Sequence, residues 1–169
     1  MENLLTAIIS RMESNATRLG LSYIDEEYGQ VDILDDETRD TYPVTFPCVL
    51  VDCQGEVWSE AGRDMQEGTA TVNVNIYIDC YDDTHAGSTT TGKAEARMGL
   101  VRDVTELLQN WKPLTNSRSL MRISARTSTN NHGIKLYQVT FTVRVFESFM
   151  PGQTVKKNLT HTIETEVNV

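Results

Sequence analysis

The sequence lacks the features that mark several large classes of protein. It contains no apolar run of about 18 residues or more, so we expect no membrane-spanning helix. The first residues, Met1–Leu5, carry neither a basic region nor a signal-like cleavage site, from which we expect synthesis in a cytoplasm. Basic residues are scarce: 15 lysines and arginines stand against 24 acidic residues, a formal charge of −9. This balance argues against a protein that wraps a nucleic-acid backbone, because such proteins need clustered basic side chains.

Cysteine and histidine are equally sparse. The three cysteines are Cys48, Cys53 and Cys80, an odd number without a C-x-x-C motif. Because all of them lie in apolar, strand-like stretches, we predict free thiols that pack as small hydrophobic side chains. The three histidines are His85, His132 and His161, and none has a cysteine or a carboxylate at zinc-ligand spacing. The sequence therefore predicts no metal site.

Catalytic motifs are missing as well. The chain has no G-x-x-x-x-G-K-[ST], G-x-G-x-x-G or G-x-S-x-G sequence. The segment Gly87–Lys93 looks superficially like a phosphate-binding loop, but Ala94 stands where a serine or threonine would bind the metal ion. We therefore predict no catalytic residue and no cofactor, in a protein that is not an enzyme.

The most informative feature that is present is a long alternation of apolar and polar residues from Gly68 to Tyr81. Its apolar positions are Ala70, Val72, Val74, Ile76, Ile78 and Cys80. A second alternation, Ile134–Glu147, places Tyr137, Val139, Phe141, Val143 and Val145 on one face. Because strand side chains point to opposite faces in turn, each segment is predicted to be a strand about twice the usual length. Such strands suit a scaffold that builds a surface.

Two segments show the apolar spacing of an amphipathic helix. The first is Glu2–Leu19, and Gly20 is suited to end it in the left-handed conformation. The second is Lys93–Trp111, and Pro113 marks its stop. Its predicted apolar stripe is Ala94, Met98, Val101, Val104, Leu108 and Trp111.

Shorter alternations predict two further strands, Cys48–Gln54 and Arg118–Ser128, each joined to a long strand by a hairpin connection. In the second of these, Met121, Ile123, Ala125 and Thr127 are expected to share a face. The element order is therefore α-β-β-α-β-β. Since hairpins imply antiparallel pairing, we predict an α+β fold, with a mostly antiparallel sheet of about four strands and two helices packed on one face. Residues 1–150 are predicted to form this single domain.

Two segments fall outside the pattern. Eight carboxylates and one arginine lie between Asp25 and Asp40. Because like charges this dense resist packing, residues 25–41 are predicted to be a solvated loop, which either aids solubility or docks a partner or cation. Residues 151–169 form a C-terminal extension with a strand-like alternation. This extension is either a frayed terminus or an arm that adds an edge strand to a neighbour.

The layout resembles that of the tail terminator, or tail completion, proteins of long-tailed bacteriophages and prophages. The resemblance covers roughly residues 1–147. It rests on Phe46–Val51, Thr71–Ile78, the helical pattern Ala-x-x-x-Met-x-x-Val-x-x-Val-x-x-Leu-Leu and Tyr137–Val145. It implies a structural virion protein that caps the tail tube as a hexameric ring, stops polymerisation of the tube and provides the head-joining surface. The implied partners are further copies of the chain, the tail tube protein and a head–tail connector protein.

A ring of six copies would carry a formal charge of −54. A negative lumen would repel phosphates, so DNA is expected to pass through without specific binding. The expected location is the tail of a virion made in the cytoplasm of a bacterial host, with no membrane contact. The uncharged face of the long strand suits contact with a neighbouring subunit. The interface candidates are Thr71, Asn73, Asn75 and Tyr77 on this strand, with Ile163 and Val167 in the extension.

Other classes of function stay open at this level. A small ligand- or protein-binding α+β module predicts a monomer with a deep apolar pocket. A hydrolase or transferase with an unfamiliar site predicts a carboxylate or histidine with a shifted pKa in a cleft. A different neck or tail structural protein of the same virion is the nearest alternative. The neighbouring genes would separate these hypotheses most cheaply.

Overall fold

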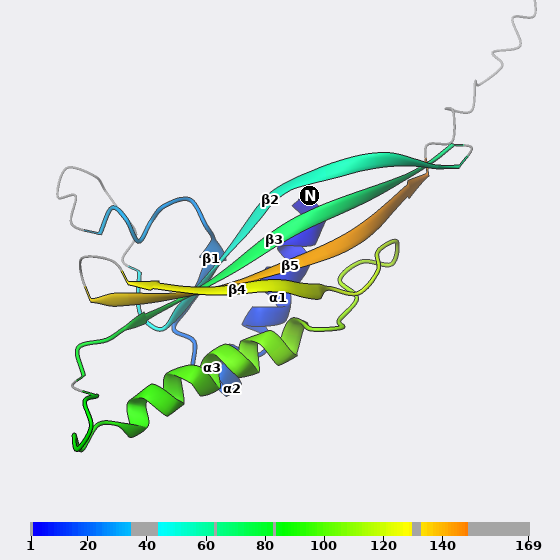
Figure 1. Ribbon diagram of the computed structural model, residues 1–169. Helices are drawn as coiled ribbons and strands as arrows, with labels where there is room; N and C mark the ends of the chain where they lie inside the picture. Colours follow the sequence, from blue (N-terminus) through cyan, green and yellow to red (C-terminus); the bar gives the residue numbers. More distant parts are fainter. Residues whose placement is uncertain (1, 35–43, 63, 83, 130–132, 149–169) are drawn as a thin grey trace, which may run out of the picture.

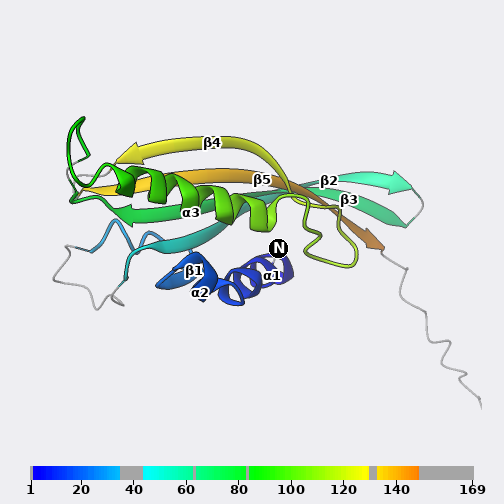
Figure 2. The same cartoon turned by 90° about the horizontal axis from the view of Figure 1, so that it is seen from below.

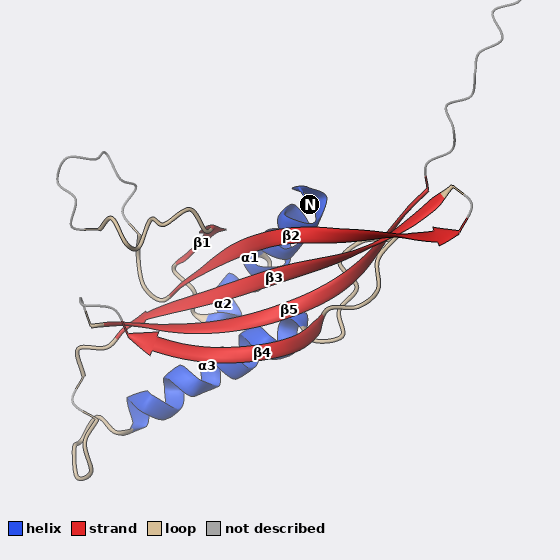
Figure 3. Ribbon diagram, turned by 45° about the horizontal axis from the view of Figure 1, so that its top comes forward, coloured by secondary structure: helices blue, strands red, loops and turns tan. Residues whose placement is uncertain are grey.

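The computed structural model describes residues 2–34, 44–62, 64–82, 84–129 and 133–148. Within these ranges the elements are α1 (Glu2–Glu13), α2 (Ala16–Leu19), β1 (Tyr23–Glu26), β2 (Cys48–Gly62), β3 (Met65–Asp79), α3 (Gly92–Leu108), β4 (Met121–Thr129) and β5 (Ile134–Ser148). The strands form one sheet in the order β1-β2-β3-β5-β4 (Figure 1). Figure 3 shows this sheet in front of the helices, which lie along its far face.

The predicted α+β class is confirmed, but the predicted strand count and order are wrong. The described residues form five strands and three helices, whereas about four strands and two helices were expected. The sheet is mixed, because β1 runs parallel to β2, with Tyr23 opposite Cys48. The remaining neighbours, β2–β3, β3–β5 and β4–β5, are antiparallel as predicted.

The additional strand β1 overlaps the start of the segment that was predicted to be a solvated acidic loop. One of its two carboxylates has local partners: Asp25 accepts hydrogen bonds from the Tyr23 hydroxyl at 2.7 Å and from the Glu26 backbone N–H at 2.8 Å. These partners offset the repulsion on which the loop prediction rested. Residues 35–43 of the predicted loop lie outside the described residues.

The first predicted helix is divided in two. The Ser14 hydroxyl and the Asn15 side-chain amide donate to the carbonyls of Ser10 and Arg11, at 2.8 and 2.9 Å. Side chains that bond the preceding turn in this way compete with the helical backbone pattern, so α1 ends at Glu13 and the chain restarts as α2. Gly20 ends α2 in the left-handed conformation, at φ +67°, as predicted.

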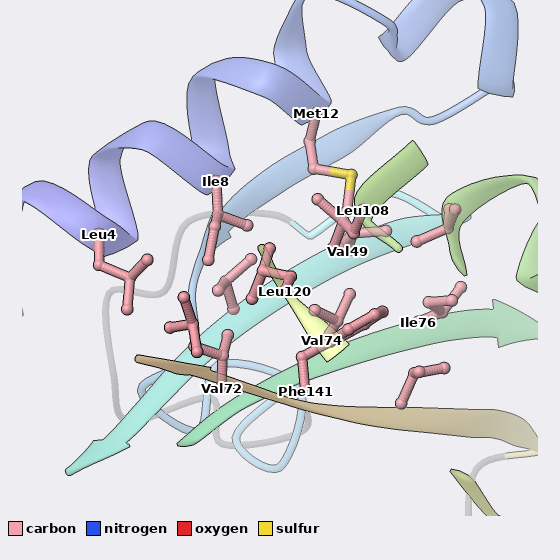
Figure 4. Packing of buried hydrophobic residues seen from close by; sticks show 14 of the residues in the cluster. Leu4, Ile8, Met12, Val49, Val72, Val74, Ile76, Leu108, Leu120 and Phe141 are labelled. Atoms are coloured by element: carbon pink, nitrogen blue, oxygen red, sulfur yellow. The ribbon is translucent and has the colours of Figure 1, made fainter. Parts of the chain in front are cut away.

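One large apolar core lies between the sheet and the helices. Figure 4 shows side chains of α1 and α3 directed at the sheet. The fully buried members of this core include Leu4, Ile8, Met12, Val49, Val51, Val72, Val74, Ile76, Val104, Leu108, Leu120 and Phe141. The predicted apolar faces of β3 and β5 are thereby confirmed. Trp58 and Trp111 pack against the edge of this core.

The predicted face of β4 is wrong, because a β-bulge interrupts its pairing with β5. Arg122 lies opposite Phe141, whereas Ser124 lies opposite Thr140, so the alternation shifts by one residue at Ile123. Met121 and Ala125 therefore point to opposite faces of the sheet. Nearly every side chain of β4 is exposed, whichever face of the sheet it points to, as expected of a strand at the end of a sheet.

The predicted apolar stripe of α3 is also only partly buried. Burial is confined to its C-terminal half, at Val104, Thr105 and Leu108, whereas Met98 is 55% exposed. The helix ends at Leu108, before the predicted Trp111. The cause is Asn110, which takes φ +61° and donates its backbone N–H to the Leu120 carbonyl at 2.9 Å, turning the chain towards β4.

Candidate functional site

The interface candidates on β3 lie on the sheet face opposite the main core. Asn73 and Asn75 are only 4% and 5% exposed. The Thr140 hydroxyl donates to the Asn73 side-chain oxygen, and the Gln138 amide donates to that of Asn75, both at 2.9 Å. These pairs follow the register of β3 with β5. Both asparagines thus have partners within the same chain.

Glu27 is the centre of this polar face. Its carboxylate accepts hydrogen bonds from the Asn75 amide at 3.2 Å, the Tyr77 hydroxyl at 2.9 Å and the Gly29 backbone N–H at 3.1 Å. Burial, together with the neighbouring Glu27 charge, raises the pKa of Tyr77 well above its usual range, so the phenol remains a donor. These bonds tie the segment after β1 to the middle of the sheet.

A second, smaller apolar cluster lies beneath this segment. Its buried members are Val31, Val44, Cys48, Leu50 and Ile134. Gln30, which is 2% exposed, donates to the Glu26 carbonyl at 2.7 Å and accepts from the Tyr28 N–H at 2.8 Å. The polar face is therefore partly covered by the chain itself. Within a single subunit it binds the segment that follows β1.

This burial bears on the predicted subunit contacts. Thr71 and Tyr77 remain half-buried, while Thr69 and Arg144, farther along the same face, are exposed. Ile163 and Val167 lie outside the described residues. A contact between this face and a neighbouring subunit therefore stays a prediction.

Four of the large exposed apolar side chains among the described residues lie in two other places. One is the projecting arm formed where β2, β3 and β5 continue past the helices (Figures 1 and 2). Val57 and Met65 on this arm are 78% and 43% exposed. The other place is β4, where Met121 and Ile123 are 50% and 58% exposed. Apolar side chains at a sheet edge suit contact with another protein surface.

The sheet edge formed by β4 begins before the strand itself, and its charged side chains are all basic. Asn116 and Arg118 continue its pairing along β5, with Arg118 N–H donating to Arg144 O and Phe146 N–H donating to Asn116 O, both at 2.7 Å. We call residues 116–129 the basic edge. It carries Arg118, Arg122 and Arg126 and no carboxylate.

The basic edge was not predicted, although the sequence shows a separation of charge along the chain. The 40 residues 107–146 hold six lysines and arginines and no acidic residue. Residues 20–60, by contrast, hold eleven carboxylates and a single arginine. The net charge of the whole chain does not reveal that one segment is basic and another acidic. The sheet order then places the described strands of the two groups on opposite sides of the molecule, β1 and β2 on one and β5 and β4 on the other.

The predicted free thiols are confirmed, although Cys53 and Cys80 are half-buried. Burial raises the pKa of the Cys48 thiol from 9.0 to about 12, with the Glu27 charge adding to the shift. Burial likewise raises the pKa of Cys53 to about 11, with Asp52 adding to it. Both thiols therefore stay protonated at neutral pH.

A pH dependence follows from these thiols. Because the folded pKa of Cys48 exceeds the unfolded value, its contribution to stability is present below about pH 9 and is lost as pH rises towards about 12. We expect Cys48→Ala to flatten the fall in melting temperature over this range. In a thiol-labelling time course at pH 8, Cys48 should react about a thousandfold more slowly than a free cysteine. Rapid labelling of Cys48 in the folded protein would contradict this expectation.

The part of the chain that the structure describes holds neither a candidate metal site nor a candidate membrane-spanning helix. Within those ranges, no group of three or more histidines, cysteines or carboxylates could hold a metal ion. Among the helices there, none combines the length and apolarity needed to cross a membrane.

Comparison with known proteins yields a likeness of fold. No family model and no curated protein sequence matches the chain. Among solved structures, a similar chain occurs in the virion of a native gene transfer agent particle. The two chains superpose with a TM-score of 0.53 at 13% sequence identity, over 85% of this chain and 94% of that chain. The superposition shows a shared fold, and at 13% identity the likeness extends to the fold alone.

Proposed function

We propose that this chain is a structural protein of a phage-like virion, and specifically a terminator that caps the tail tube as a hexameric ring. The observation that carries the proposal is the fold likeness to a chain of a gene transfer agent virion, which extends over 94% of that chain. The resemblance in layout to phage tail terminators supports the finer assignment. This structural role requires no catalytic step, cofactor or metal.

The surfaces described above support an assembling role. The sheet ends in strands whose outer sides have no strand partner among the described residues. The arm extends β2, β3 and β5 beyond the body and exposes Val57 and Met65. In this proposal, the chain assembles with further copies of itself, the tail tube protein and a head–tail connector, and it resides in the virion tail.

The test of the capping role is the length of the tube. If the chain stops polymerisation, particles made without its gene should contain tubes of uncontrolled length and heads without tails. Expression of the wild-type chain in trans should restore tails of one length, measured by negative-stain electron microscopy. Normal tails joined to heads in the absence of the chain would contradict the proposed function.

A further inference from the structure

The two ends of the sheet differ in charge. At one end lies the basic edge, residues 116–129, where Arg122 and Arg126 are exposed and Ile123 provides an apolar contact. At the other end lies β1, followed by residues 27–32. There Glu26 and Asp32 are exposed and Asp25 is half-buried, and we call Tyr23–Asp32 the acidic edge.

Both edges offer backbone groups for further pairing. In the described chain, β4 pairs only with β5 and β1 pairs only with β2, so each strand has one side without a strand partner. On the outer side of β4, the Arg122 N–H already donates to the Gln109 side-chain oxygen at 3.0 Å, so further pairing there involves the residues that follow Arg122. A nine-residue edge strand without proline or lysine is a template for adding another strand. Proteins usually protect such an edge, and an intermolecular partner is one form of protection.

Charge determines which pairing is allowed. Two basic edges would place arginine against arginine, and two acidic edges would place carboxylate against carboxylate, and both arrangements are repulsive. Only a basic edge against an acidic edge is complementary. Because the two surfaces differ, the contact is heterologous, the type that closes into a ring when its rotation permits.

We propose that the basic edge of one copy docks on the acidic edge of the next copy, head to tail around the ring. This inference rests on the proposed function and names the surfaces that join its subunits. Pairing of the edges leaves the remaining, strongly acidic part of each subunit to face solvent and the lumen. The arginines act here as intermolecular partners of Glu26 and Asp32.

Two complementary variants test the proposal. One carries Arg122→Glu and Arg126→Glu, so that both of its edges are acidic. The other carries Glu26→Arg and Asp32→Arg, so that the exposed charges on both of its edges are basic. Each variant alone should lose self-association by at least about tenfold in Kd. An equimolar mixture should recover it, because each reversed edge then meets its complement.

The altered residues have exposed side chains, so melting temperatures should stay close to wild type, and circular dichroism verifies folding. If a reversal disturbs folding, the milder pair Arg122→Gln and Arg126→Gln serves in its place. The matched control is Arg18→Glu with Arg102→Glu, which changes net charge equally on exposed helical positions and should assemble normally. Arg118 is left unchanged because its guanidinium lies over the Phe146 ring, 5.6 Å from the centroid.

Native mass spectrometry and sedimentation velocity at low and high salt provide the measurement. Assembly of wild type that weakens with salt, loss in each variant and recovery in the mixture support the proposal. A wild-type chain that stays monomeric at every concentration overturns it. So does unchanged assembly of either variant, or a mixture of folded variants that fails to recover.

Other occupants of the basic edge give different outcomes. If removal of residues 149–169 abolishes assembly while both reversals leave it intact, the C-terminal segment occupies the edge and the proposal is wrong. If Arg122→Glu and Arg126→Glu abolish binding to duplex DNA without affecting assembly, the edge is a nucleic-acid surface and the proposal is likewise wrong. If rings form equally well after charge reversal, the edge contact is wrong but the capping role is not contradicted. If ring formation depends on the edges but loss of the chain does not change tube length, only the capping role is wrong.

Discussion

Replacement of Glu27 by alanine is expected to lower the free energy of unfolding by about 2–4 kcal/mol. The substitution removes the carboxylate that accepts hydrogen bonds from Asn75, Tyr77 and Gly29. Asn75 is 5% exposed, so its amide loses a partner where water has little access. Urea unfolding, followed by tryptophan fluorescence, provides the measurement.

A graded series separates hydrogen bonding from charge at this site. Glu27→Gln keeps one acceptor oxygen but places an amide donor near a second donor, so its stability should fall between that of wild type and that of the alanine variant. The neighbouring Glu26→Ala is the control, because that side chain is exposed. Its effect on the single subunit, measured at protein concentrations below those of assembly, should stay within about 0.5 kcal/mol. Equal stability of Glu27→Ala and Glu26→Ala would show that the polar face does not depend on Glu27.

Replacement of Phe141 by alanine should cost about 3–5 kcal/mol. Phe141 is fully buried on β5 and lies among the core side chains of the sheet (Figure 4). Removing the ring leaves a cavity between the sheet and the helices, which the surrounding side chains fill only in part. The melting temperature should fall by about 10 °C, measured by calorimetry.

The matched control for Phe141 is Phe146, the same residue type on the same strand. Phe146 is half-buried near the projecting arm, outside the main core. Phe146→Ala should cost about 1 kcal/mol, a value typical of substitutions outside the core. A loss at Phe141 no greater than that at Phe146 would contradict the central position of Phe141 in the core.

The elements with strong periodicity could be predicted from the sequence. The apolar alternation in β3 and β5 identified the core face correctly because a strand fixes side-chain direction with a period of two, whatever surrounds it. A second local rule placed Gly20 at a helix end, because the positive φ of that position favours glycine. Periodicity carried no information on β1, since Tyr23–Glu26 is short and forms only when β2 lies beside it.

The candidate site was less accessible to sequence reasoning. The pattern showed that Asn73 and Asn75 share a polar face, but it did not show what covers that face. Glu27, which is 48 residues from Asn75 in the chain, supplies the missing partner. The bulge at Ile123 likewise depends on how β4 fits β5, so the predicted face of β4 could not be tested from its own residues.

By itself, the sequence determined the α+β class, the core faces of the long strands and the separation of charge along the chain, because these follow from local geometry and residue order. Only the tertiary structure decided that β1 and β4 form opposite ends of one sheet, acidic at one end and basic at the other. Strand order depends on contacts between distant segments, and no local pattern encodes it. The same distant contacts made Glu27 the hydrogen-bond partner of the polar face and left Arg122 and Arg126 exposed, on opposite faces of β4.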